Sequence, residues 1–281
     1  MANAVIPVAP GSAVRAPTND ELDAVFRSRF GDPATTGPVP KLWHRFGYYP
    51  PDLVYEAFLD RLVRPGISWM DVGCGRQVLP NNIALGEALA RRCERLVGVD
   101  PDPTIEENPF VHARVRCPIE EFETDDRFDL ITLRMVAEHI RYPAPVLANL
   151  ARLTKPGGHV VVLTVNRWSP VSVAAGLVPF RLHHAAKRLV WGTEERDTFP
   201  VAYRMNTRRR LRRLFEGHGF GEAYFARVAD CRVFYRQRPL HRVELAVWRM
   251  LSAVGVTYPE NCLLGVYERA ERDSGRGSDA G

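Results

Sequence analysis

Hydrophobic and polar positions along the chain follow two different periods. Five apolar runs are short enough to be buried strands: residues 67–72, 96–99, 111–115, 128–133 and 159–165. Between these runs, apolar residues recur every three or four positions at 83–93 and 145–153, which is the period of a helix. The alternation predicts parallel βαβ units with helices on both faces of one sheet.

The segment before the first strand predicts two helices. One spans about 20–30, with Asn19 or Asp20 as its cap, and the other spans about 51–63. The segment between them, residues 31–51, is rich in proline and carries an aromatic cluster, so we expect it to be a loop.

The alternation lapses after residue 165 and then resumes. Four elements are predicted there: a helix at 207–217 capped by Thr207, a strand at 223–228, a helix at 243–254 and a last strand at 262–267. We expect the last strand to be antiparallel to the others and the 243–254 helix to pack outside the sheet.

The composition is that of an ordinary folded chain. Of the 281 residues, 46% are hydrophobic and 25% charged, which excludes a mostly disordered or collagen-like chain. The formal net charge is +5, and because all but three of the 38 basic residues are arginine, we ascribe the charge to codon bias rather than to nucleic-acid binding. Five cysteines without a CxxC pair indicate a reduced, cytoplasmic protein without a zinc site. No apolar stretch approaches the ~20 residues of a membrane span.

The first strand ends in an acid and a glycine turn, Asp71-Val72-Gly73-Cys74-Gly75. Glycine lets the backbone approach a ligand where a Cβ would clash, and open α/β sheets bind ligands at the carboxyl ends of their strands. The third glycine of a dinucleotide fingerprint is absent. The carboxylate of Asp71 disfavours a pyrophosphate and favours an ammonium or sulfonium group. Asp100 ends the second strand, where a carboxylate can accept both hydroxyls of a ribose.

These residues resemble class I S-adenosylmethionine-dependent methyltransferases over about Tyr55–Arg167. Five motifs carry the resemblance: Trp69–Gly75, Val97–Asp100, Cys117–Glu120, Phe128–Arg134 with Ala137–Ile140, and Leu153–Gly158. The resemblance implies a doubly wound α/β fold with a seven-stranded, mostly parallel, Rossmann-like sheet, an N-terminal cap and a lid after strand five. It also implies S-adenosyl-L-methionine as the cofactor.

The resemblance also implies the boundaries and the binding residues. The single domain would span 20–270, as a cap (20–65), a cofactor-binding core (66–165), a lid or substrate region (166–206) and the C-terminal part of the sheet (207–270), between a flexible leader (1–19) and a disordered tail (271–281). The expected cofactor-binding residues are Asp71, Gly73, Cys74, Gly75, Asp100, Pro101, Glu120 and Arg134, with no metal. Asp71 and the turn would hold the methionine portion, Asp100 the ribose and Glu120 the adenine edge.

Each of these residues also has a simpler interpretation. Asp71 and Asp100 fit as caps of the turns that follow them. Cys74 fits as a small residue in the turn rather than a nucleophile. Glu120 lies in an acidic run typical of a solvated surface, and Arg134 fits a structural role as well as a contact with cofactor or substrate.

His139 is the candidate catalytic residue. It follows strand four, whose carboxyl end lies beside the transferring methyl group in this fold, and a neutral imidazole can accept a proton from an attacking hydroxyl. Contact with cofactor or substrate and a purely structural role remain alternatives.

Two further segments bear on the acceptor. Residues 43–49 and 166–206 are candidate lids, and the second contains a basic cluster, His183-His184 with Lys187 and Arg188. The arginine-rich run 208–213 is predicted to be the solvent face of an amphipathic helix, since no aromatic residues interleave with it. Residues 166–220 resemble bacterial methyltransferases of glycan, lipid or secondary-metabolite pathways, and this resemblance implies methylation of a small molecule, at oxygen. The alternatives are an RNA or protein methyltransferase and a non-catalytic cofactor-binding regulator.

Overall fold

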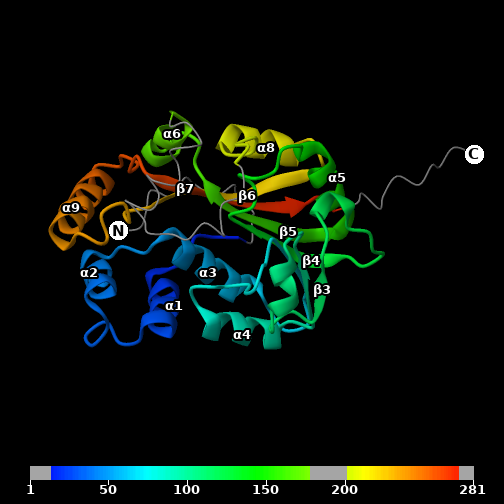
Figure 1. The fold of residues 1–281 in the computed structure, drawn as a ribbon, viewed down its shortest axis with the longest axis horizontal. Coiled ribbons are helices and arrows are strands. Elements are labelled where there is room, and N and C mark those ends of the chain that lie inside the picture. The colour runs from blue at the N-terminus through cyan, green and yellow to red at the C-terminus, as the bar shows by residue number, and fades with distance from the viewer. Residues whose placement is uncertain (1–13, 178–200, 272–281) are drawn as a thin grey trace, which may run out of the picture.

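The structure is a computed structural model that describes residues 14–177 and 201–271. Its centre is a seven-stranded sheet in the order β3-β2-β1-β4-β5-β7-β6 (Figure 1). The strands are β1 (Ser68–Val72), β2 (Arg95–Val99), β3 (Ala113–Val115), β4 (Phe128–Arg134), β5 (Thr154–Val165), β6 (Phe220–Ala229) and β7 (Asn261–Arg269). Strands β1 to β5 pair in parallel, and β7 is antiparallel to both of its neighbours. The predicted fold class is confirmed.

Helices cover both faces of the sheet. The α-helices are α1 (Asn19–Phe30), α2 (Pro38–Phe46), α3 (Pro51–Leu62), α4 (Ile83–Arg92), α5 (Pro143–Leu153), α6 (Pro170–Leu177), α8 (Arg208–Glu216) and α9 (Arg238–Ala253). Short 3₁₀ turns, η1 (Pro103–Glu107) and η2 (Ile119–Glu121), follow β2 and β3. In Figure 1, α3 and α4 lie on one side of the sheet and α5 and α8 on the other.

The two layers follow from the period of the strands. Trp69 belongs to the core cluster that contains α1, α3 and α4, whereas its neighbour Met70 belongs to the cluster that contains α5 and α8. Leu130 and Ile131 of β4 divide in the same way. Because successive side chains of a strand point to opposite faces, a strand that is apolar at every position needs a helix layer on each side.

Several boundaries differ from those predicted. The segment predicted as a loop contains α2, since Pro38 and Pro40 lie in its first turn, where the missing N–H is tolerated. Residues 155–158, between the predicted helix at 145–153 and the predicted strand at 159–165, form a bulge inside β5. Helix α9 begins five residues before the predicted start, because its proline lies at the N-terminus.

The N-terminal boundary also moves. The cap of α1 is Thr18, rather than Asn19 or Asp20, and it forms a reciprocal capping box with Glu21. Val14 is buried in the core. The flexible leader predicted over 1–19 is therefore wrong for 14–19, and residues 1–13 lie outside the described residues, as do 272–281 of the predicted tail.

The prediction for the arginine-rich helix is confirmed. Thr207 caps α8, and Leu211 and Phe215 are its buried residues, with Phe215 stacked on Tyr267 of β7 at 3.8 Å between ring centroids. No helix in the described ranges, 14–177 and 201–271, is long and apolar enough to span a membrane.

The predicted loop is fixed to α9 by a buried polar chain. The indole N–H of Trp43 donates to His241 Nε2 at 2.8 Å, so the Nδ1 of the same ring carries the proton that it shares with Glu244 at 3.0 Å. Glu244 also accepts the backbone N–H of Val233 and of Phe234. This chain joins the N-terminal cap to the helix between β6 and β7, so residues 43–49 begin in the core rather than in a free lid.

We predict that His241→Leu lowers the free energy of unfolding by ~3 kcal/mol, because it leaves the buried Trp43 N–H without an acceptor and removes one of the donors that satisfy the buried Glu244 carboxylate. Urea denaturation followed by circular dichroism measures the change. Leu240→Ala on the exposed side of the same helix should change it by less than ~0.5 kcal/mol. Equal stability of the His241 variant and wild type would show that the chain contributes nothing.

Candidate functional site

The two predicted acids lie at the same edge of the sheet. Asp71 is the next-to-last residue of β1 and pairs in register with Gly98 of β2, two residues before Asp100. The charge of Asp100 raises the pKa of Asp71, so the two carboxyl groups are within electrostatic reach of each other. Strand order reverses between β1 and β4, and such a switch point is where open α/β sheets bind ligands.

Asp71 is a buried carboxyl group held by a chain of hydrogen bonds. The hydroxyl of Thr132 in β4 donates to Asp71 Oδ1 at 2.5 Å, and the indole N–H of Trp69 donates to the same hydroxyl at 2.8 Å. Burial raises the pKa of Asp71 to about 7, although the Thr132 bond and the charge of Arg134 act in the opposite direction. Asp71 therefore orients toward β4 and does not cap the turn.

The glycine turn requires its first glycine for packing. Gly73 has a φ of +70°, donates its N–H to the carbonyl of Val99 at 2.8 Å, and a Cβ on it would lie 2.3 Å from Cγ2 of Val136. Gly75 has a φ of +46°, and a Cβ there would meet no atom closer than 3.9 Å. Thus Gly73 packs the turn against the loop after β4, whereas Gly75 is required by its left-handed backbone conformation rather than by a clash of a Cβ with its neighbours Thr104 and Asp100.

Cys74 turns its side chain into the core. It is buried, and its Sγ occupies the space beside Gly98, where a Cβ would come within 2.7 Å of the sulfur. Burial raises the pKa of the Cys74 thiol, which makes it a poor nucleophile. The interpretation of Cys74 as a small packing residue is the one the geometry favours, so its contribution to a ligand is limited to its backbone.

Asp100 is oriented by two backbone donors. Its Oδ2 accepts the N–H of Gly75 and its Oδ1 accepts the N–H of Asp102, each at 2.8 Å. The cap of η1 is Asp102, whose carboxylate accepts the N–H of Thr104. A carboxylate oxygen accepts more than one hydrogen bond, so both oxygens of Asp100 retain a lone pair for a ligand.

The turn after β4 contributes a third acid. Glu138 is buried, accepts the hydroxyl of Thr164 at 2.7 Å, and its carbonyl accepts the N–H groups of Ala202 and Tyr203. Burial raises the pKa of Glu138, and the charges of His139 and Arg134 oppose that rise. Glu138 thus ties the segment after the undescribed residues to the loop that carries His139.

Sequence reasoning missed several of these polar residues. Tyr55 and Glu56 of α3 and Thr132 of β4 are all buried, and the pKa of Tyr55 is raised by burial and by the charge of Asp71. Burial likewise raises the pKa of Glu56 to about 7, while its Oε2 accepts the amide of Asn82 at 2.9 Å. The available signal was Thr132, a hydroxyl between the apolar residues Leu130-Ile131 and Leu133 of a buried strand.

The remaining predicted residues lie around this edge. Arg134 is the last residue of β4, rather than the first after it, and its charge acts on Asp71, Glu56 and Glu138. His139 is half-buried in the turn after β4, Pro101 is exposed beside Asp100, and Glu120 is exposed on η2. The basic cluster of His183, His184, Lys187 and Arg188 lies outside the described residues.

Comparison with known proteins decides the family. Residues 42–221, well over half of the chain, match the family described as a methyltransferase domain. The chain belongs to this family. The resemblance predicted from the glycine turn and the two acids is confirmed.

Two relatives named "Ubiquinone biosynthesis O-methyltransferase" are each 33% identical to this methyltransferase. The one from Rhodopseudomonas palustris (strain BisB18) matches over 118 residues, 39% of this chain and 44% of the relative. The one from Hahella chejuensis (strain KCTC 2396) matches over 157 residues, 50% and 60% respectively. The chain therefore matches only about half the length of these relatives.

A solved structure shows the same fold. A chain from the complex between the Haloferax volcanii Trm112 methyltransferase activator and a methyltransferase has a TM-score of 0.51 at 17% identity. The match covers 92% of this chain and 99% of that one. At this identity the likeness concerns the fold alone.

S-adenosylmethionine is the cofactor of this class of methyltransferase, and the residues present fit it. Asp100 offers free lone pairs to a diol, and Gly75 leaves space for a ligand against the backbone. Asp71 places a carboxyl group where a cationic ligand is favoured over an anionic one. Within the described ranges, no group of three or more His, Cys, Asp or Glu side chains could hold a metal ion.

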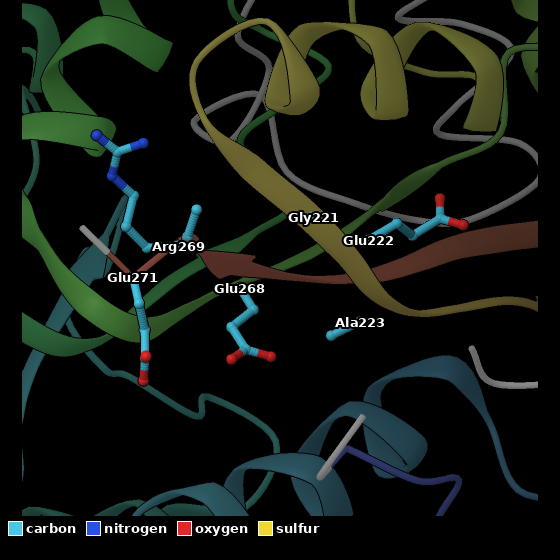
Figure 2. A pocket seen from close by; sticks show the side chains of 7 residues that line it. Gly221, Glu222, Ala223, Glu268, Arg269 and Glu271 are labelled. Atoms are coloured by element: carbon cyan, nitrogen blue, oxygen red, sulfur yellow. The ribbon is translucent and has the colours of Figure 1, made fainter. Parts of the chain in front are cut away.

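A pocket of about 350 Å³ lies elsewhere, at the far end of the sheet. Figure 2 shows Glu222, Glu268, Arg269 and Glu271 around it. These residues come from the start of β6 and from the end of β7 or just after it. Glu268 pairs in register with His159, which lies at the amino end of the β5 segment that pairs regularly with β4. The pocket is thus separated from the methyltransferase site by the length of the sheet.

We predict that Asp100→Ala weakens binding of S-adenosylmethionine at least about tenfold, or ~1.4 kcal/mol, because a hydroxyl pair loses its acceptor. Isothermal titration calorimetry measures the dissociation constant. Glu106→Gln, an exposed acid on the neighbouring turn η1, is the matched control and should bind as wild type does. An unchanged constant for the Asp100 variant would remove this residue from the site.

A second prediction concerns pH. Since the pKa of Asp71 is about 7 in the free protein, its carboxyl group is mostly neutral below that pH and charged above it. A cationic ligand favours the charged form, so affinity for S-adenosylmethionine should rise as pH increases through about 7, by up to about tenfold per pH unit below it. Calorimetry between pH 5.5 and about 8.5 tests this. The Asp71→Asn variant should bind S-adenosylmethionine more weakly, with an affinity that changes less with pH. An equally steep pH profile for that variant would assign the pH dependence to another group.

Proposed function

We propose that this methyltransferase transfers the methyl group of S-adenosylmethionine to an oxygen atom of a small molecule. The observation that carries the oxygen acceptor is the match to relatives named O-methyltransferases, two of them at 33% identity. The site supports binding of the cofactor, because its acids and its glycine turn suit a cationic nucleoside.

The bound cofactor supplies an electrophilic methyl group, and the protein supplies alignment and exclusion of water. We assign the methionine portion to Asp71 and the backbone of Gly73–Gly75, the ribose to Asp100 with Pro101 beside it, and the adenine edge to Glu120. The positive charge of Arg134 favours the ionised forms of the buried acids Asp71 and Glu138. The position of Asp71 near the carboxyl end of β1, beside the switch point between β1 and β4, supports the first of these assignments.

His139 is the proposed proton acceptor. It lies in the turn after β4, next to Glu138, whose contacts with Thr164 and with the backbone of residues 202–203 hold that turn in place. A hydroxyl acceptor loses its proton as oxygen attacks carbon, and a neutral imidazole at this position takes that proton. The residues that would hold the cofactor and the acceptor would have to align the acceptor oxygen with the methyl group, because methyl transfer of this class is an in-line displacement.

We also propose that the reaction takes place in the cytoplasm. All five cysteines lie within the described residues, and none of them forms a disulfide. Free thiols of this kind are typical of a reducing compartment.

The acceptor class can be tested with labelled S-adenosylmethionine and three sets of acceptors: phenols and catechols, primary amines, and RNA. The proposal predicts transfer to the hydroxyl compounds and a product in which the label is bound to oxygen. Labelling of the amines or of RNA alone would contradict it, and binding of the cofactor without any labelled product would favour a regulator.

For His139→Asn we predict a fall in kcat of at least about 100-fold with an oxygen acceptor, because the proton acceptor is removed. The dissociation constant of the cofactor should stay within about twofold, which separates catalysis from binding. Single-turnover kinetics and calorimetry provide the two numbers. Arg141→Gln, at an exposed position two residues later, is the control. Near-normal turnover of the His139 variant at every pH would reject a base at this position.

A further inference from the structure

Helix α9 has an unusual exposed face. Its buried side consists of His241, Glu244, Leu245 and Trp248. On the other side, five apolar residues recur at alternating spacings of three and four, which places them in one row: Leu240, Val243, Val247, Met250 and Val254, here called the α9 stripe. Val243 is 60% exposed, Met250 62% and Val254 70%. A helix with one buried face ordinarily has polar residues opposite it, so this row needs a partner.

The exposed charged residues of the segment that contains α9 are all basic. Between Asp230 and Glu260 the sequence has one acid, Glu244, and that acid is buried. Arg238, Arg242 and Arg249 form a second exposed row, about 140° from the stripe around a helix of 3.6 residues per turn. None of the three forms an ion pair with another residue in the described ranges.

The helix also stands at the edge that carries the active site. Ala229 at the end of β6 pairs with Asn261 at the start of β7, and Cys262 pairs with Val165 at the carboxyl end of β5. The connection that contains α9 therefore leaves the sheet at the same edge as Asp71 and Arg134. Figure 1 shows α9 and α6 together at one end of the molecule.

The segment before α6 adds to this edge. Trp168 is 69% exposed and lies against the guanidinium group of Arg167, and the N–H of Val171 donates to Glu260 just before β7. Indole rings with a neighbouring cation are frequent where proteins meet the headgroup region of a bilayer.

We propose that α9 docks this methyltransferase on an anionic lipid surface, with the α9 stripe in the boundary of the acyl chains and Arg238, Arg242 and Arg249 on the headgroups. An exposed apolar row with cations as its only exposed charges is the pattern of a helix that lies in a membrane interface. Docking there brings the site edge of the sheet to the lipid. The inference does not rest on the proposed function, since binding to lipid needs no turnover.

A second copy of the chain fits this face less well. A twofold contact pairs a patch with itself, so two such helices would bring apolar rows together but offer no acid to any arginine. Anionic headgroups neutralise the arginines, and the acyl boundary covers the row. The charge pattern therefore favours lipid over self-association.

Flotation of the full-length protein with vesicles tests the proposal, using phosphatidylglycerol mixed with phosphatidylcholine and, in parallel, phosphatidylcholine alone. The protein should float with the anionic vesicles. Arg242→Gln with Arg249→Gln should weaken this binding about thirtyfold, from roughly fivefold per arginine. Val243→Glu with Met250→Glu should abolish it, and because both side chains are exposed the fold should tolerate them. Calorimetry with S-adenosylmethionine, at unchanged affinity, confirms that each variant is folded.

The matched control lies on the other arginine-rich helix. Arg209→Gln with Arg213→Gln removes the same charge from exposed positions of α8 and should leave flotation unchanged. An equal loss in that control would show that net charge, and not α9, binds the vesicles. Absence of flotation in the wild type would overturn the proposal. So would a dimer, detected by light scattering, that becomes a monomer on Val243→Glu with Met250→Glu while neither form floats.

Discussion

The structure of the site depends on one buried carboxyl group. Asp71 lies near the end of the central strand β1 and is held through Thr132 to the indole of Trp69, so a hydrogen-bond chain crosses from β1 to β4 and back. Burial makes the charged form costly and raises the pKa to about 7. A cation that binds beside the Asp71 carboxyl group stabilises its charged form. The cost of ionising this buried acid and its selectivity for a cationic ligand thus have the same physical origin.

The surrounding contacts place the other groups relative to that carboxyl. The packing of Gly73 against Val136 ties the glycine turn to the loop after β4. The N–H of Gly75 then orients Asp100, and Glu138 anchors the far end of the same loop. Each part of the site is therefore positioned by a contact with a different strand, and the switch point between β1 and β4 is where those strands converge.

The edge of the sheet that holds the candidate site also carries α9, which has an exposed apolar face. The buried Trp43–His241–Glu244 chain holds α9 against the N-terminal cap, and this attachment fixes which side of α9 faces outward. The attachment explains why the apolar row is exposed, because a helix that buries one face must expose the opposite one. Recognition of a small acceptor and attachment to a surface would then occur at one end of the sheet.

The sequence alone determined the parallel sheet, the antiparallel last strand, the family and the two acids, because each depends on local period or on motifs within a few residues. Local pattern predicted the cap of α8 at Thr207 but missed α2, whose prolines suit a first turn as well as a loop. Only the tertiary structure decided that Thr132 contacts Asp71 and that Tyr55 lies close enough for their charges to interact, since the burial of a polar residue depends on elements distant in sequence. For the same reason, spacing alone predicted the helix of α9 but not which of its faces would remain uncovered.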